Sequence, residues 1–217
     1  QPAIMELMDA GCLAAVHRLL SLAPPTPGSA QLTIQTDGPA AAAEADAIAA
    51  VLRGEGASVR VAADDAEADL LWTIRRSMHP ALEAQGTTLI EDVSVPRSQL
   101  AAMFGEIARI EQQYGLEIPT VCHAGDGNLH PNFVFDGDEV PPIVWDAASD
   151  LFRSALRLGG TLTGEHGIGV LKKQWLAEEL GDDQWELQRQ IARVFDPTGI
   201  LNPGKVFSPD PAYRPCQ

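Results

Sequence analysis

HAGDGNLH, residues 123–130, places an Asp-Gly pair between two apolar segments. An Asp-Gly dipeptide in this setting is the strongest short-range signal for a β-hairpin with a two-residue type I′ turn. The turn would be centred on Asp126 and Gly127. His123 then lies opposite His130, and directly opposed residues share a sheet face with Cβ atoms about 4.5–5.5 Å apart. The segment therefore predicts a hairpin that brings two imidazoles together on one face.

Two imidazoles in this arrangement can hold one divalent metal ion when a third ligand comes from elsewhere in the chain. A second motif, GGTLTGEHGIG at residues 159–169, has five glycines in eleven residues and predicts an irregular loop. Glu165 in this loop is the natural third ligand, giving two histidines and one carboxylate with open positions for a substrate. His166 is a candidate general base, because an imidazole titrates near neutral pH.

Simpler interpretations of both motifs stay open at this point. The two histidines can be surface residues of a hairpin, and a glycine-rich loop can lack a function. Asn132, however, lies two residues beyond His130 and therefore on the same strand face. The pattern predicts a polar cluster there rather than an isolated pair of histidines.

Other polar residues, outside these two motifs, are further candidates for the site. Arg75, near the end of a helix predicted over residues 64–78, is a solvated charge or, if it points inward, a bidentate clamp for a carboxylate. His79, one turn further on, is either structural or reaches the same pocket. Lys172 and Lys173 are expected at the surface. The tail that contains Asn-Pro-Gly-Lys, residues 202–205, is a plain C-terminal cap or an edge suited to an anionic or electron-accepting cofactor.

Composition narrows the class of protein. The 217 residues are 45% hydrophobic and 21% charged, which is ordinary for a globular protein in water. A net charge of −15 argues against nucleic acid or an anionic membrane surface as a partner, since both attract basic patches. It argues less against a small anionic substrate, because one local arginine or metal ion outweighs distant acidic residues.

The cysteines and the apolar segments predict the compartment. Cys12, Cys122 and Cys216 form an odd set without CxxC spacing, which favours free thiols in a reducing environment. No apolar run approaches the length of a membrane span, and no secretory signal is found. We therefore expect a cytoplasmic protein without a transmembrane segment.

Hydrophobic periodicity, turn residues and caps predict the order of elements. Helices are expected over residues 4–22, 39–53, 64–78, 97–114, 141–158, 168–180 and 183–195, and strands over residues 31–36, 57–62, 87–95, 118–125 and 128–135. This order predicts one domain over residues 1–217 of the α+β class. Its architecture would be a ferredoxin-like antiparallel sheet with helices packed on one face, plus C-terminal helices.

Three motifs taken together resemble a known family. HAGDGNLHP (123–131), GGTLTGEHGIG (159–169) and FDPTGILNPGK (195–205) occur in this order, and the likeness extends over essentially the whole chain. They resemble the C-terminal domain of FAD-linked oxidases of the vanillyl-alcohol oxidase superfamily. Flavoprotein subunits of glycolate oxidase and the D-lactate and D-2-hydroxyglutarate dehydrogenases are the similar members. The resemblance implies a flavoenzyme whose larger N-terminal half, which binds FAD, is absent from these 217 residues.

The resemblance also implies roles for individual residues. His123, His130 and Glu165 would hold a divalent metal, namely Zn, Mn or Fe, and His166 would be the catalytic base. The remaining implied roles are substrate binding for Arg75 and Asn132 and flavin contact for Asn202 and Lys205. His79 is a further substrate-binding candidate, which rests only on its position one turn beyond Arg75.

The implied reaction is oxidation of a small 2-hydroxy acid, in the D form when chiral, to the 2-oxo acid with hydride transfer to the flavin. Ile90 stands where relatives that oxidise 2-hydroxyglutarate have a substrate-binding lysine. A small monoacid such as glycolate or D-lactate is therefore expected. An electron acceptor or an iron–sulfur subunit is the expected partner, with peripheral membrane attachment of the whole complex or a homo-oligomer also compatible with the resemblance.

Two other functions remain open from the residues alone. The same three ligands can activate water in a metal-dependent hydrolase, which would need no flavin. They can also form a structural metal site in a non-catalytic binding module. Structural sites normally have four protein ligands, however, and only three candidates are found here.

Overall fold

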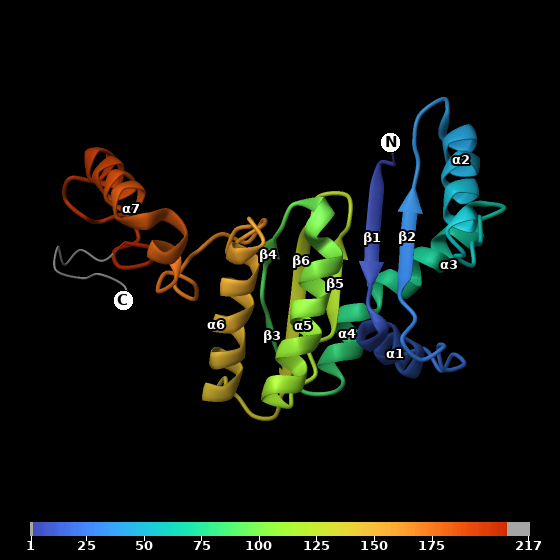
Figure 1. Ribbon diagram of the computed structural model, residues 1–217, viewed down its shortest axis with the longest axis horizontal. Coiled ribbons are helices and arrows are strands. Elements are labelled where there is room, and N and C mark those ends of the chain that lie inside the picture. Colours follow the sequence, from blue (N-terminus) through green and yellow to red (C-terminus); the bar gives the residue numbers. More distant parts are fainter. Residues whose placement is uncertain (1, 208–217) are drawn as a thin grey trace.

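The computed structural model describes residues 2–207, and its sheet and helices are shown in Figure 1. The strands are β1 (Ile4–Met8), β2 (Gln31–Gln35), β3 (Thr87–Ile90), β4 (Val93–Ser94), β5 (Thr120–His123) and β6 (Asn128–Phe135). The helices are α1 (Ala10–Leu19), α2 (Ala41–Gly54), α3 (Asp65–Arg76), α4 (Met78–Glu83), α5 (Leu100–Tyr114), α6 (Pro142–Arg157) and α7 (Leu176–Phe195), with a 3₁₀ turn at Arg97–Gln99. None of these helices combines the length and apolar character that a membrane crossing requires.

One six-stranded sheet organises the fold. The strand order is β2-β1-β5-β6-β3, with β4 also paired to β6, and every pairing is antiparallel. The predicted α+β class with a mainly antiparallel sheet is therefore confirmed. The β5–β6 hairpin lies at its centre.

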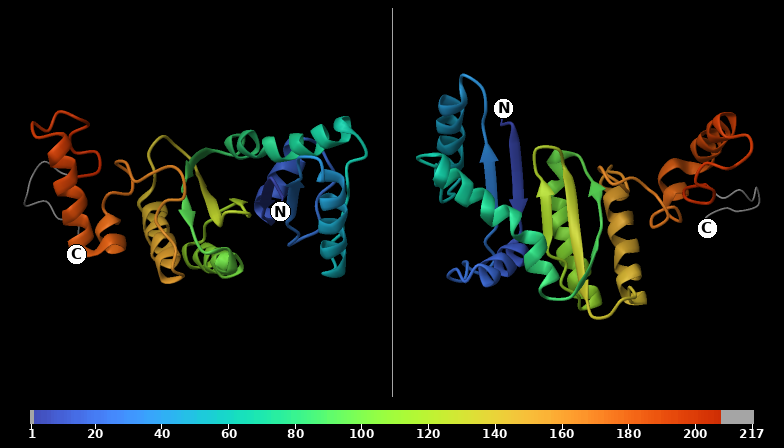
Figure 2. Two further views of the ribbon diagram at one scale, coloured as in Figure 1. Left: turned by 90° about the horizontal axis from the view of Figure 1, so that it is seen from above. Right: turned by 180° about the vertical axis from the view of Figure 1, so that it is seen from behind.

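Helices cover the two faces of this sheet unequally. Cys122 and Phe133 point to the face on which α5 and α6 build the larger apolar core, and these two helices lie together on one side of the strands in the left view of Figure 2. Val121 points to the opposite face, where α1 and α4 build a smaller core. His130 opposes Val121 and so shares that second face. The part of the face beside the smaller core carries the polar residues described below.

The hairpin turn differs from the prediction. His123 pairs with Asn128, and His130 pairs with Val121, so the loop contains four residues rather than two. The His123 carbonyl accepts hydrogen bonds from the N–H groups of Asp126 and Gly127, both at 3.0 Å. Gly127 has a φ of +82°, whereas Asp126 stays at negative φ, and a type I′ turn needs both central residues at positive φ.

The change in register nevertheless leaves both histidines on the predicted face. Side chains alternate with a period of two, and the register is shifted by two residues. His123 and His130 are therefore diagonal neighbours instead of a directly opposed pair. The prediction of a shared face is confirmed, and that of direct opposition is wrong.

The N-terminal helix prediction is wrong over its first five residues. Residues 4–8 form β1, and α1 begins only after Asp9. The Asp9 carboxylate accepts from the Cys12 N–H at 2.8 Å as an N-cap and from the Thr120 N–H at 2.7 Å. This aspartate ends the strand and starts the helix, because it satisfies a free helical N–H group and ties it to β5.

Further differences lie at irregular segments. Residues 57–62 form no strand, and the strand predicted over 87–95 is interrupted at Glu91 and Asp92. The predicted helix over 168–180 is non-helical up to Trp175, and Gly181 kinks α7 with a φ of +69°. Cys12 and Cys122 are buried free thiols, as expected, and Cys216 lies outside the described residues.

Candidate functional site

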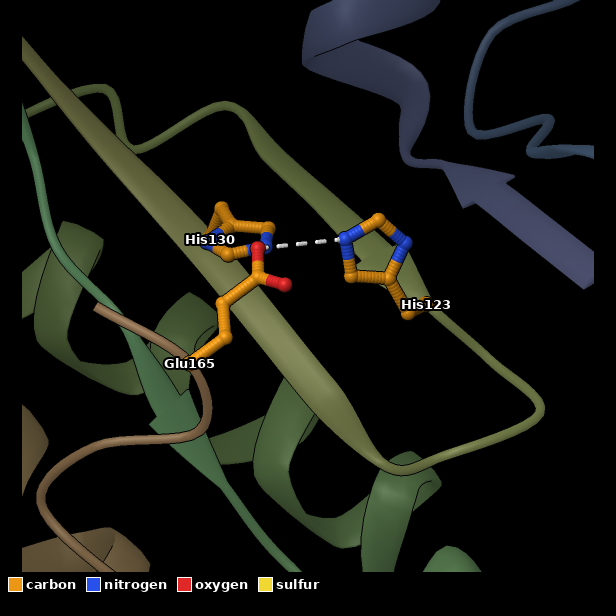
Figure 3. A group of neighbouring side chains, drawn as sticks. All are labelled: His123, His130 and Glu165. Atoms are coloured by element: carbon orange, nitrogen blue, oxygen red, sulfur yellow. Dashed lines mark ion pairs between the residues drawn. The ribbon is translucent and has the colours of Figure 1, made fainter. Parts of the chain in front are cut away.

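The three predicted ligands meet at one point. One ligating atom from each of His123, His130 and Glu165 lies within 4.8 Å of the other two. The Glu165 Oε1 atom is 3.4 Å from His123 Nε2 and 3.1 Å from His130 Nε2. Figure 3 shows the carboxylate reaching from its loop toward both rings, which themselves meet edge to face at 5.1 Å between centroids. We call these three residues the metal cluster.

A buried glutamate supports His123 from behind. Glu6 on β1 pairs with His123 on β5, and its Oε1 atom accepts a hydrogen bond from His123 Nδ1 at 2.6 Å. Its other oxygen, Oε2, accepts from Arg75 Nε at 3.1 Å and Arg75 Nη2 at 2.8 Å. Sequence reasoning missed Glu6 because residues 4–8 were assigned to a helix. The four apolar residues around Glu6 in this short segment fit a helix as well as a strand, so the sequence carries no signal for it.

A second carboxylate, that of Asp92, organises the glycine-rich loop. Its Oδ2 atom accepts from the Thr163 hydroxyl at 2.7 Å and from the N–H groups of residues 164, 165 and 166 at 2.9, 3.1 and 2.9 Å. Burial opposes ionisation of Asp92, but these donors and the charge of Lys172 outweigh it and hold its pKa below the ordinary value. Asp92 thereby fixes the backbone that carries Glu165 and His166.

Asp92 also faces His130. Asp92 Oδ1 and His130 Nδ1 are 3.9 Å apart, and both atoms are buried without a hydrogen-bond partner among the described residues. Burial first, and the neighbouring His123 second, lower the pKa of His130. The neutral imidazole is the form that binds a metal ion.

These surroundings fit a divalent metal ion. Both histidines turn Nε2 toward Glu165 and Nδ1 toward a carboxylate, Glu6 for His123 and Asp92 for His130. Metal-binding histidines in proteins characteristically have such a carboxylate behind the ring. The Glu165 side chain is 53% exposed, so one side of the cluster is open. Two histidines, one carboxylate and an open side match a site that leaves positions for a substrate.

Close packing explains one glycine of the loop. A Cβ atom on Gly164 would overlap the side-chain amide of Asn128 on β6. Asn128 Nδ2 lies 3.4 Å from His130 Nε2. Only glycine lets the loop approach the strand closely enough for the next residue, Glu165, to join the metal cluster.

His166 lies beside the metal cluster. Its ring stacks on His130 with 5.0 Å between centroids and 23° between planes. Its Nε2 atom is 3.8 Å from Glu165 Oε1, and the side chain is 47% exposed. The position suits a residue that exchanges a proton with a bound molecule, as predicted for the base, but the role itself stays a prediction.

The predicted substrate-binding residues occupy different settings. Arg75 reaches the site through Glu6. Asn132 is fully buried, and its Nδ2 group donates to the carbonyl oxygens of Pro119 at 3.0 Å and His130 at 2.7 Å. His79 is exposed on α4, and no ion pair or ring contact within residues 2–207 joins it to the metal cluster. The structure thus brings Arg75 and Asn132 to the site and leaves His79 outside it.

Lys172 is buried at 4% exposure, so the expectation of a surface lysine is wrong. Its Nζ atom donates to the carbonyl oxygens of Asp92 and, at 3.0 Å, Leu162, and it lies 3.5 Å from Glu91 Oε2. Burial raises the pKa of Glu91 to about 7 and lowers that of Lys172. The lysine ties Asp92, between β3 and β4, to the glycine-rich loop. This contact was not predictable, because Asp92 and Lys172 are 80 residues apart.

The predicted flavin-contacting residues lie away from the metal cluster. Asn202 and Lys205 follow α7, which extends to the side of the sheet in Figures 1 and 2. Asn202 has a φ of +45°, and its carbonyl accepts from the Lys205 N–H at 3.2 Å in a tight turn. Both side chains are exposed, and their predicted contact with flavin stays a prediction.

Comparison with known proteins finds a matching family and several relatives. The family described as FAD linked oxidases, C-terminal domain, matches residues 1–206. The glycolate oxidase subunit GlcD of Bacillus subtilis (strain 168) is 38% identical over 98% of this chain and 47% of its own length. The D-lactate dehydrogenase of Archaeoglobus fulgidus is 37% identical over 75% of this chain and 36% of its own length.

A solved structure shows the same fold. The 4-ethylphenol oxidase from Gulosibacter chungangensis, in its isoeugenol complex, superimposes with a TM-score of 0.58 at 14% identity, over 94% of this chain and 47% of that one. This chain spans less than half the length of the relatives that it matches. It belongs to the family of FAD linked oxidases, C-terminal domain.

Proposed function

We propose that this chain is the metal- and substrate-binding half of an FAD-dependent enzyme that oxidises a small 2-hydroxy acid to a 2-oxo acid. The observation that carries the proposal is the metal cluster, in which each histidine has a carboxylate behind its ring and His166 lies alongside. Relatives named as a glycolate oxidase subunit and a D-lactate dehydrogenase support this class of substrate.

The metal ion would be held by His123 Nε2, His130 Nε2 and Glu165. When bound, such an ion supplies a Lewis acid that lowers the pKa of a hydroxyl group attached to it. His166 takes the hydroxyl proton at its Nε2 atom, which points toward the metal cluster. The flavin, bound by the other half of the enzyme, supplies the hydride acceptor.

Arg75 orients the substrate. It uses Nε and Nη2 to hold Glu6, which leaves the two N–H groups of Nη1 to receive a substrate carboxylate. Its side chain is only 16% exposed, so a carboxylate held there would be partly shielded from water. A fixed carboxylate keeps the α-carbon in one place relative to the base and the hydride acceptor.

A small monoacid fits this half better than a diacid. Ile90 on β3 pairs with Asn132 on β6 and therefore lies on the same sheet face as the metal cluster. Its apolar side chain offers no partner for a second, distal carboxylate, and an unpaired buried charge is costly. Glycolate or D-lactate is the substrate that we infer.

The exposed apolar side chains of α7 favour a second half of the protein that packs against this helix. Six apolar side chains on and just after α7 are between 49% and 79% exposed, namely Leu187, Ile191, Val194, Phe195, Ile200 and Leu201. Large exposed apolar surfaces mark protein–protein interaction sites, among other uses. We infer that the flavin-binding half of the longer protein packs here.

The test uses the longer protein with its flavin, under anaerobic conditions. Addition of D-lactate or glycolate should bleach the flavin absorbance, and D-2-hydroxyglutarate and L-lactate should bleach it far more slowly. Failure of every 2-hydroxy acid to reduce the flavin would contradict the proposal. Ester or amide hydrolysis by the 217-residue chain alone would favour a metal-dependent hydrolase instead.

A further inference from the structure

Glu6 stands between two residues of the site and gives one oxygen to each. Its Oε1 atom meets His123 Nδ1 at 2.6 Å, and its Oε2 atom meets the Nε and Nη2 groups of Arg75. The Glu6 side chain is only 10% exposed, so water competes little for either oxygen. Glu6 and Arg75 are 69 residues apart in sequence, and β1 and α3 bring them together.

We propose that Glu6 is a positioning residue that fixes His123 in the tautomer with its proton on Nδ1. The inference rests on the proposed metal cluster and deepens it. A carboxylate can only accept hydrogen bonds, so at 2.6 Å the His123 Nδ1 atom must carry the hydrogen. The Nε2 atom then has its lone pair free, and this is the atom that faces Glu165.

Arg75 makes this arrangement rigid. Two of its N–H groups donate to the single oxygen Glu6 Oε2, so the carboxylate cannot rotate away from His123 without losing both charge-assisted hydrogen bonds. Arg75 is the residue proposed to orient the substrate, and Glu6 therefore also links the substrate clamp to one metal ligand.

His130 lacks an equivalent constraint. The carboxylate behind it, Asp92, lies 3.9 Å away, which is too long for a hydrogen bond. Its Nδ1 atom has no partner among residues 2–207. The tautomer of His123 is thus set by a direct contact, whereas that of His130 is not, and the two rings should respond differently to changes at Glu6.

Glu6→Gln tests the inference with little change in shape. Glutamine has one acceptor oxygen and one NH₂ donor. Arg75 donates to the oxygen, which leaves the NH₂ group facing His123 Nδ1 and forces the ring proton onto Nε2. Nitrogen-15 NMR of the metal-free chain at pH 8 should show the Nδ1–H tautomer of His123 in the wild type and the Nε2–H tautomer in Glu6→Gln. The affinity of the Glu6→Gln chain for Zn²⁺ should fall about 10- to 100-fold relative to the wild type.

A second variant separates this effect from a loss of stability. In the double variant Glu6→Gln, Arg75→Met, the side-chain amide at position 6 has no arginine partner. It is free to rotate and can present its oxygen to His123 Nδ1. The Nδ1–H tautomer and most of the Zn²⁺ affinity should return, although this double variant departs further from the wild type. If Glu6 had only a structural role, the double variant would bind Zn²⁺ more weakly than Glu6→Gln does.

The outcomes are distinct. An unchanged His123 tautomer in Glu6→Gln, or no recovery in the double variant, would overturn the inference. A wild-type chain that shows the Nδ1–H tautomer and binds no Zn²⁺ would instead remove the proposed metal cluster while leaving the role of Glu6 intact. The NMR measurement needs no metal, so the two failures cannot be confused.

Discussion

Replacing Asp92 with asparagine should lower the free energy of unfolding by about 3–5 kcal/mol, because it removes one partner of a buried charged pair. The carboxylate is fully buried, it accepts four hydrogen bonds from the glycine-rich loop, and it lies beside the buried Lys172. Urea unfolding at pH 7 measures the change. The exposed Asp138, replaced in the same way, serves as the control and should change stability by less than about 0.5 kcal/mol.

The pH dependence of this difference gives a second check. The pKa of Asp92 is lower in the folded chain than its ordinary value of 3.8. Its stabilising effect is therefore fully present above the unfolded pKa and is lost as the pH falls through the folded pKa. The gap between wild type and Asp92→Asn should persist at neutral pH and close only in acid. Superimposable unfolding curves at pH 7 would contradict the role given to Asp92.

Replacing His166 with alanine should slow anaerobic reduction of the flavin in the longer protein by about 10²–10⁴-fold, the usual effect of removing a general base. Its backbone N–H, which binds Asp92, is kept in alanine, and half of its side chain is exposed, so the loop should keep its shape. Metal and flavin contents should stay at wild-type levels.

Glu165→Ala is the matched comparison for that variant. It removes a predicted metal ligand one residue away, so metal content should fall together with the rate. Stopped-flow reduction of His166→Ala at the wild-type rate would defeat the assignment of the base. Loss of metal from His166→Ala would show instead that this residue acts as a ligand.

The sequence predicted the parts of the site that depend on local chemistry. An Asp-Gly turn between apolar segments predicted the hairpin, and the two-residue period of a strand kept His123 and His130 on one face in spite of the wrong turn length. Glycine density predicted that residues 159–169 form an irregular loop, which Gly164 illustrates by its contact with Asn128. The three proposed ligands were therefore predictable.

The surrounding residues were not predictable, because their partners lie far away in sequence. Glu6 and His123 are 117 residues apart, and Asp92 and His166 are 74 apart. Apolar residues at helical spacing over 4–22 also hid the strand that carries Glu6, since periodicity in a short segment fits either element. Lys172 looked like a surface charge because nothing nearby in sequence reveals the carbonyl oxygens that surround it.

Equilibrium dialysis of the chelator-treated 217-residue chain against Zn²⁺ or Mn²⁺ measures the proposed metal site directly. We predict one equivalent of metal per chain for the wild type and for His79→Ala, whose imidazole is exposed on α4, and none for the double variant His123→Ala, His130→Ala. Deprotonated ligands are required, so the bound metal should also be released as the pH falls. Binding of one equivalent with unchanged affinity by the double variant, or no binding by the wild type, would contradict a metal centre at His123, His130 and Glu165.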